Sequence, residues 1–73
     1  MEPEELKETG QRLFHAGQYS DALPLLKSAV DAFPEDESLW MDLVQAARNS
    51  GQFEQAIDLT KQAIHQHPRS DWM

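Results

Sequence analysis

Three histidines are the residues of this chain best suited to acid–base or metal chemistry. His65 and His67 are two positions apart, so on a helix their side chains would point about 200° from each other. A helical metal site uses ligands spaced three or four apart, and no carboxylate partner for His15 is evident in the sequence. We therefore expect no metal site and no catalytic histidine.

The serines and carboxylates form no catalytic motif either. Ser20 and Ser38 are explained by positions at helix N-termini. The acidic residues between Asp31 and Glu37 would need an enclosing pocket to work as a hydrolytic pair, and a solvated loop followed by a helix start is the simpler interpretation. The three glycines are isolated, so no phosphate-binding loop is present. The sequence predicts a protein that is not an enzyme and holds no cofactor.

The composition narrows the class of partner. The chain has 73 residues, no cysteine and a net charge of -7, with only six Lys and Arg. Nucleic acids and anionic membranes are bound by basic patches, so we expect neither, and a protein or peptide partner would be neutral or basic. No apolar run is long enough to span a bilayer, and the acidic start lacks the features of an export signal. We expect an intracellular, cytoplasmic location.

The element that would position any site is a repeat of 34 residues. Residues 3–36 align with 37–70, and this register makes eight pairs identical, including Gly17 with Gly51 and Pro34 with Pro68. A glycine just past a helix can adopt a positive φ that ends it, and proline cannot continue a helix. Each unit is therefore predicted to be helix, tight turn, helix and stop.

Apolar periodicity places the helices near 3–16, 19–32, 37–49 and 53–66. Asp36 is a suitable N-cap for the third helix. Pro24 is expected in the first turn of the second helix, where its missing amide has no helical partner to lose. Four alanines recur seven apart on the second and fourth helices, where small side chains allow close helix packing: Ala22, Ala29, Ala56 and Ala63. Gly10 is expected to act likewise, and Tyr19 and Phe53 to fill the wedge between the helices of each pair.

This pattern resembles the tetratricopeptide repeat. In the first unit the matching residues are Leu6, Gly10, Leu13, Gly17, Tyr19, Ala22, Ala29 and Pro34; in the second they are Trp40, Leu43, Gly51, Phe53, Ala56, Ala63 and Pro68. The resemblance implies an all-α fold: one domain over residues 1–73, a right-handed superhelical stack of antiparallel helix pairs (an α-solenoid), with repeats at 3–36 and 37–70. Residues 71–73 would begin a truncated further helix, with Ser70 as its N-cap.

The resemblance also implies where a partner would bind. The first helices of successive units in this family line a concave face, and here the candidate groove residues are Lys7, Gln11, Phe14, Met41, Asp42, Gln45, Arg48 and Asn49. Some family members grip acidic chaperone tails with a Lys and Asn clamp. Lys7 matches its first position, but Gln11 and Asp42 stand where asparagines belong, and the charge of Asp42 would repel a carboxylate. We expect a neutral or basic ligand instead.

Two functions remain open. The first is a protein–protein interaction module that binds a peptide or protein segment on the concave face. The alternative is a structural stacking or self-association unit of a longer repeat protein, with no ligand of its own. Stacked repeats need a polar outer face at their ends, and Ile57 and Ile64 of the fourth helix would be left partly bare. This uncapped helix offers a possible route to a homo-oligomer.

Overall fold

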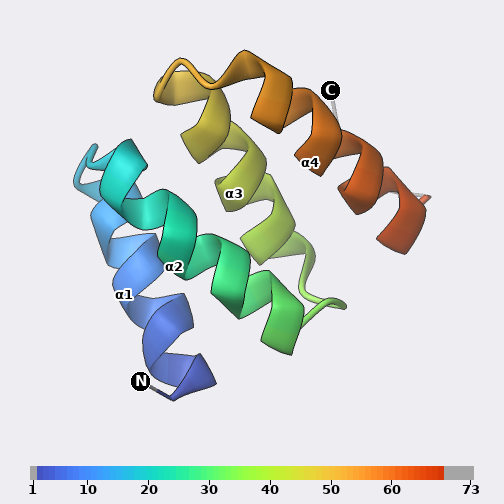
Figure 1. Ribbon diagram of the computed structural model, residues 1–73. Coiled ribbons are helices and arrows are strands. Elements are labelled where there is room, and N and C mark those ends of the chain that lie inside the picture. The colour runs from blue at the N-terminus through green and yellow to red at the C-terminus, as the bar shows by residue number, and fades with distance from the viewer. Residues whose placement is uncertain (1, 69–73) are drawn as a thin grey trace.

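Four helices form the whole of the regular structure in residues 2–68, the part of the chain that the computed structural model describes. They are α1 (Pro3–His15), α2 (Tyr19–Ala32), α3 (Glu37–Asn49) and α4 (Phe53–Gln66). Consecutive helices are antiparallel neighbours, and α3 contacts both α1 and α2 (Figure 1). The predicted all-α helical stack is confirmed. The predicted helix bounds agree with the structure except in α1, which ends at His15 with Ala16 as its C-cap.

The two turns inside the helix pairs have the same hydrogen-bonded geometry. The amides of Gly17 and Gln18 donate to Phe14 and Leu13, at 3.0 and 2.9 Å. The corresponding turn after α3 repeats both bonds, at 3.1 and 2.9 Å. Both turn glycines have a φ of 83°, which a side chain would strain. The predicted role of these glycines is confirmed, and it explains why both units have a glycine at this position.

The start of α3 is fixed by Asp36, whose side chain accepts a hydrogen bond from the Leu39 amide at 3.3 Å. The prediction of this N-cap is confirmed. The prediction for Pro24 is wrong, because Pro24 is the sixth residue of α2 and lies inside the helix. Its ring removes the amide that would bond the Ser20 carbonyl. Ser20 and Pro24 are both exposed, so water can satisfy that carbonyl.

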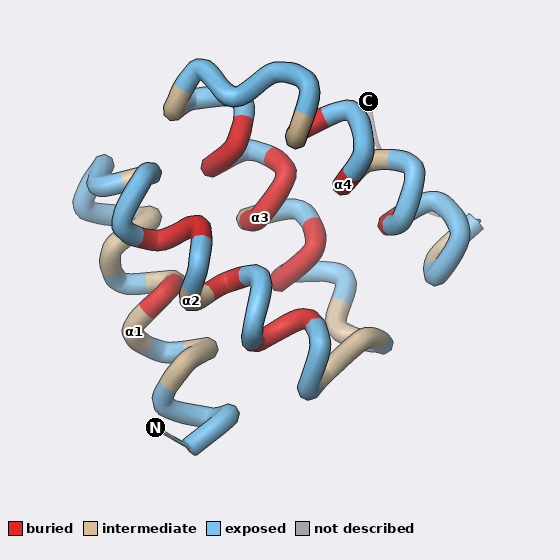
Figure 2. Tube along the Cα trace, viewed as in Figure 1, coloured by how far each residue is buried: buried red, intermediate tan, exposed pale blue. Residues whose placement is uncertain are grey.

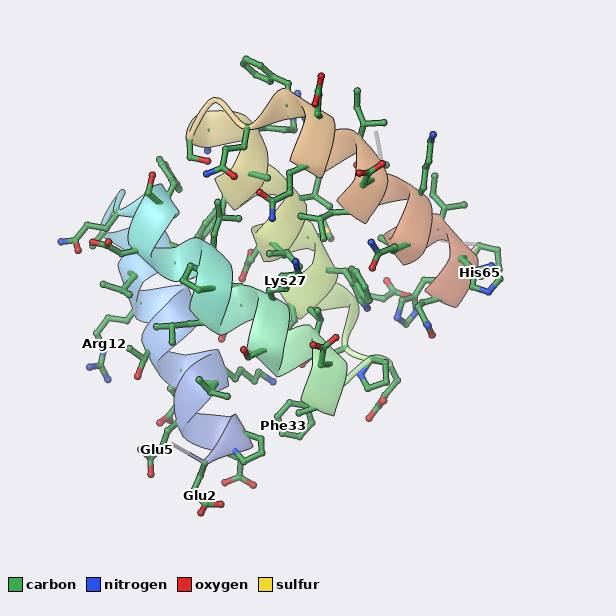
Figure 3. All side chains as sticks on the ribbon, in the orientation of Figure 1. Glu2, Glu5, Arg12, Lys27, Phe33 and His65 are labelled. Atoms are coloured by element: carbon green, nitrogen blue, oxygen red, sulfur yellow. The ribbon has the colours of Figure 1, made fainter. Side chains whose placement is uncertain are left out.

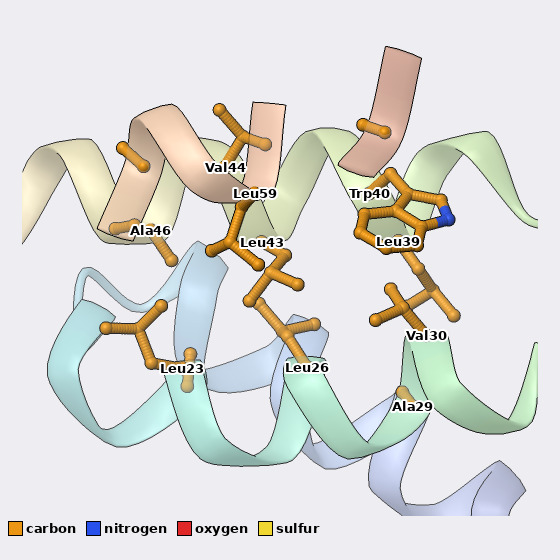
Figure 4. Packing of buried hydrophobic residues seen from close by; sticks show 14 residues of the cluster. Leu23, Leu26, Ala29, Val30, Leu39, Trp40, Leu43, Val44, Ala46 and Leu59 are labelled. Atoms are coloured by element: carbon orange, nitrogen blue, oxygen red, sulfur yellow. The ribbon is translucent and has the colours of Figure 1, made fainter. Parts of the chain in front are cut away.

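The core is a layer of leucine, valine and alanine side chains between α2, α3 and α4 (Figures 2 and 4). Leu26, Leu39 and Leu43 are its largest fully buried side chains. Trp40 is buried too, and its indole Nε1 donates to the Pro34 carbonyl at 2.8 Å. The indole therefore contributes apolar burial and joins α3 to the turn that precedes it.

Small residues allow the helices of each pair to approach, as predicted. All four repeated alanines are buried. A Cβ added at Gly10 would lie 3.0 Å from Cδ2 of Leu26, a fully buried side chain that has little room to move. Gly10 is thus required by packing, whereas Gly17 and Gly51 are required by backbone conformation.

The prediction that Phe53 fills a wedge between helices is wrong. Its counterpart Tyr19 is half-buried and meets the ring of Phe14 edge-on, with centroids 5.5 Å apart. Phe53 is instead 65% exposed, because the position of Phe14 is held in the second unit by Arg48, an exposed cation.

The predicted helix start at residues 71–73, with its Ser70 cap, lies outside the described residues. None of the described helices combines the length and the apolarity that crossing a membrane requires.

Candidate functional site

Two polar contacts join α1 to α3 and its cap on the side of the molecule where the sequence placed a groove. The Lys7 ammonium forms an ion pair with Asp36 at 2.7 Å. One turn further along α1, the Gln11 side-chain amide donates to Asp42 Oδ2 at 3.1 Å. We call this surface the α1/α3 face and define it by Lys7, Gln11, Asp36 and Asp42, together with the exposed neighbours Met41 and Gln45.

The charges on this face are not equivalent. Hydrogen bonding to Lys7 holds the pKa of Asp36 below its usual value, and the same bond raises the pKa of Lys7. For Asp42, burial raises the pKa above that of an ordinary carboxylate, although the hydrogen bond from Gln11 acts in the opposite direction. Lys7 is thus already paired, whereas Asp42 is partly desolvated and bonded to a neutral amide.

No ammonium or guanidinium group of the described residues lies within ion-pair distance of Asp42. The nearby His15 lowers the pKa of Asp42, whereas the nearby Asp36 raises it. A half-buried carboxylate with this environment is stabilised by an incoming cation. Chemically, the α1/α3 face can accept a lysine or arginine side chain at Asp42, while Gln45 offers an exposed amide and Met41 an exposed apolar surface, 46% accessible.

Three other predicted groove residues lie apart from this cluster. Phe14 is half-buried near the end of α1 and packs against the core and Tyr19. Arg48 lines a separate groove between α3 and α4. Asn49 is exposed as the last residue of α3. The structure therefore brings together Lys7, Gln11 and Asp42, with Met41 and Gln45 on the same helix as Asp42.

Sequence reasoning assigned Asp36 a role as a helix cap and missed that it also neutralises Lys7. One carboxylate oxygen caps α3 and the other accepts from the Lys7 ammonium. The 29-residue separation between these two residues gives no local signal in the sequence. This ion pair occupies the lysine that a carboxylate clamp would use.

One of the three histidines, His67, has a structural role at the end of α4. His67 caps the C-terminal end of α4, and its Nε2 lies 3.0 Å from the Pro34 carbonyl oxygen, which Trp40 also bonds. Its Nδ1 lies 3.5 Å from a Glu37 carboxylate oxygen. These contacts tie the end of α4 to the turn between the two units. Within residues 2–68, no three potential ligands gather as a metal site would require.

A second groove runs between α3 and α4 and is mostly apolar. Its lining consists of Val44, Arg48, Phe53, Ala56, Ile57, Thr60 and Lys61. Ile57 is 56% exposed there, and Ile64 further along α4 is 45% exposed. We call the exposed stripe formed by Phe53, Ile57 and Ile64 the α4 stripe. The bareness that the sequence predicted for the two isoleucines is confirmed for the described part of the chain.

Comparison with known families gives one match, in which a family model described as the tetratricopeptide repeat covers residues 13–72. The chain belongs to the tetratricopeptide repeat family. Neither the comparison with curated proteins nor the comparison with solved structures gave a match.

The tetratricopeptide repeat assignment agrees with the four helices and with the glycine turns that repeat in register. Repeats of this family generally serve as non-catalytic interaction or scaffold modules, so membership points to a protein partner. Which face of this chain is used, and for what partner, depends on the geometry described above.

Proposed function

We propose that this chain is a protein–protein interaction module whose α1/α3 face binds a neutral or basic segment of another protein. The observation that carries the proposal is the environment of Asp42. Its carboxylate is half-buried, has a raised pKa and accepts a hydrogen bond from a neutral amide, while the neighbouring Asp36 is matched by Lys7.

A basic segment would also meet acidic side chains on the helix that carries Gln11. Glu4 and Glu8 are exposed on α1, and the whole chain carries a charge of -7. Such a field speeds the approach of a positively charged segment and becomes weaker as salt is added. Gln45 would then bond the backbone of the segment, and Met41 would cover one of its apolar side chains.

The experiment compares a lysine-containing peptide, its glutamine analogue and its glutamate analogue by isothermal titration calorimetry. We expect the lysine peptide to bind most tightly and the glutamate peptide least. Asp42→Asn should weaken the lysine peptide about 10- to 100-fold, because a hydrogen bond to a charged group contributes roughly 1.5–3 kcal/mol, while binding of the glutamine analogue should change little.

The matched control is Asp31→Asn, which removes the same charge from an exposed position on α2. It should leave the preference for lysine intact and alter affinity only through the general field of the molecule. Equal losses in the two variants would show that net charge, and not the α1/α3 face, selects the peptide. Tighter binding of the glutamate peptide would overturn the proposal.

The second candidate function is self-association, and it is favoured by a different observation. The α4 stripe leaves Phe53, Ile57 and Ile64 exposed, and contiguous apolar patches of this kind mark interaction surfaces. In this function α4 is the used surface, and the α1/α3 face needs no ligand. A cytoplasmic setting remains a prediction for both functions.

A further inference from the structure

The α4 stripe has an internal counterpart that shows what such a surface does in this fold. Shifting by 34 residues places Ile57 on Leu23 and Ile64 on Val30. Leu23 and Val30 belong to α2 and are only 6% and 3% exposed, because α3 packs against α2 (Figure 4). The same face that is an interface on α2 is therefore open on α4.

The opposite end of the molecule cannot cover the α4 stripe. On α3, the helix that covers α2, the residues Leu39, Leu43 and Ala46 are fully buried. To cover α4 in the same way, α1 of a second copy would need apolar residues at the corresponding positions. In α1 the same three positions hold Glu5, Thr9 and Arg12. Figure 3 shows Glu5 and Arg12 on the outer side of α1, pointing away from the other helices.

This polar end has a consequence for assembly. Seating α1 of a second copy on α4 would bury a carboxylate and a guanidinium against isoleucine, which is unfavourable without paired charges. A head-to-tail contact of that kind would also propagate into a ring or an open filament, and not stop at a pair. Two copies can instead cover the stripe with the same α4 surface on both, related by a two-fold axis.

The charges beside the stripe complement themselves in that arrangement. Glu54 and Asp58 follow the stripe on the side away from α3, by the helical spacing of 3.6 residues per turn. Lys61 lies at the edge of the stripe, one turn from Ile57, where its side chain also lines the groove between α3 and α4. When two α4 helices run antiparallel about the centre of the stripe, Phe53 lies opposite Ile64 of the second copy. Lys61 then lies opposite a point on the second copy's α4 between Glu54 and Asp58. The two-fold symmetry produces this contact twice.

We propose that the chain forms a closed, two-fold dimer through antiparallel α4 helices, with the α4 stripe at its centre and Lys61 paired with the acids of the second copy. This inference develops the self-association function and does not depend on peptide binding by the α1/α3 face, so either proposal can fail while the other stands.

Sedimentation equilibrium of the full chain over a range of concentrations tests the dimer. The weight-average mass should rise from the 8.4 kDa of one chain toward twice that value and go no higher. Ile57→Glu should hold the mass at that of one chain. The matched control is Gln62→Glu, which adds the same charge at an exposed position on another side of α4 and should still dimerise.

A charge exchange identifies the second copy as the partner. Lys61→Glu should raise the dimer dissociation constant about tenfold, since two symmetry-related clusters each lose a surface pair and gain a repulsion. The triple variant Glu54→Lys, Asp58→Lys, Lys61→Glu restores opposite signs across the axis and should return the constant to near its original value. These exposed substitutions keep the test valid even if circular dichroism shows that Ile57→Glu fails to fold.

The proposal is overturned by any of four results. The original chain could stay at 8.4 kDa throughout the concentration range, or its mass could grow beyond that of a dimer. Gln62→Glu could weaken association as much as Ile57→Glu does. The triple variant could associate no better than Lys61→Glu alone, which would mean that the charges meet a different surface.

Discussion

The two repeat units share a backbone plan and differ in what covers them. Both have the same glycine turn, with a φ of 83° and the same pair of turn hydrogen bonds. In the first unit α2 is covered by α3, whereas α4 of the second unit has no such cover within the described residues (Figure 2). A residue's burial here is thus decided by its neighbour in the stack more than by its type.

The helix contacts inside the two units also differ in a reciprocal way. Gly10 faces Leu26 in the first unit, and the same two positions hold Val44 and Thr60 in the second. The larger side chain has moved from the second helix to the first. Thr60 satisfies its hydroxyl by donating to the Ala56 carbonyl at 2.7 Å, as a helical threonine can. The two units therefore fill the same gap from opposite sides.

The largest difference in stability cost between equivalent substitutions should appear at Leu6 and Trp40, the fourth residue of each unit. Trp40→Ala should destabilise the fold by about 3–5 kcal/mol, because a buried indole leaves a large cavity, and the Pro34 carbonyl also loses a donor. Leu6→Ala should cost less because Leu6 is only half-buried. Urea unfolding followed by circular dichroism measures both, and a larger cost for Leu6→Ala would contradict this placement of the core.

The next comparison is Leu23→Ala with Ile57→Ala, two equivalent positions of opposite exposure. Leu23→Ala should lower the free energy of unfolding by about 2–5 kcal/mol, because Leu23 is buried. The exposed Ile57 should change the stability of a single chain by about 0.5 kcal/mol or less. Thermal unfolding at low protein concentration separates the two, and a cost at Ile57 near that at Leu23 would show that α4 is covered.

A smaller contrast is expected from enlarging the helix-contact alanines. Ala22→Leu should cost about 1–3 kcal/mol by overpacking a fully buried site. Ala56→Leu should fall at the lower end of that range, because Ala56 borders the open groove between α3 and α4. Chemical denaturation of the two variants checks the order, and an unchanged midpoint for Ala22→Leu would remove the alanines from the interface.

The smallest effect is the pH dependence of the ion pair in the first unit. The pKa of Asp36 is lowered by Lys7, so its contribution is present at neutral pH and is lost as the pH falls through the lowered value. The pKa of Lys7 is raised, so its contribution is lost as the pH rises through the raised value. Lys7→Met should therefore weaken the pH dependence of the unfolding free energy at both low and high pH. The second unit already has a methionine, Met41, at this position.

Asp42 should behave in the opposite sense to Asp36. Burial raises its pKa, so ionised Asp42 disfavours the fold, and the penalty disappears as the pH falls below the raised value. Asp42→Asn should leave stability at neutral pH unchanged or slightly higher, while Asp36→Asn should lower it. Unfolding measured at pH 7 and pH 4 for both variants distinguishes the two carboxylates.

The local rules of the fold were readable from the sequence. The turn glycines, the alanine stripes, the Asp36 cap and the helix bounds all follow from short-range geometry or from the 34-residue register. Pro24 was placed one turn too early. The exposed Ser20 carbonyl in α2 tolerates the loss of its helical hydrogen bond, and no sequence pattern indicates this exposure. Phe53 was wrongly placed because its ring partner is absent: Arg48 replaces the Phe14 of the first unit.

The candidate site was less readable, since its decisive contacts join distant residues. Lys7 with Asp36 and Gln11 with Asp42 are 29 and 31 residues apart. The sequence placed Lys7, Gln11 and Asp42 on the same face, but only the structure shows that Lys7 is matched by Asp36 and that Asp42 is bonded to a neutral amide. Phe14 and Arg48 separate from that cluster because one faces the core and the other faces the α3–α4 groove.

The most direct test is an amide-resolved NMR titration with the lysine peptide, repeated at two protein concentrations. We predict peptide-dependent shifts at Gln11, Met41, Asp42 and Gln45, and shifts that depend only on protein concentration along Phe53–Ile64. Peptide-dependent shifts confined to α4, with the α1/α3 face unchanged, would contradict binding at Asp42 and make α4 the interaction surface.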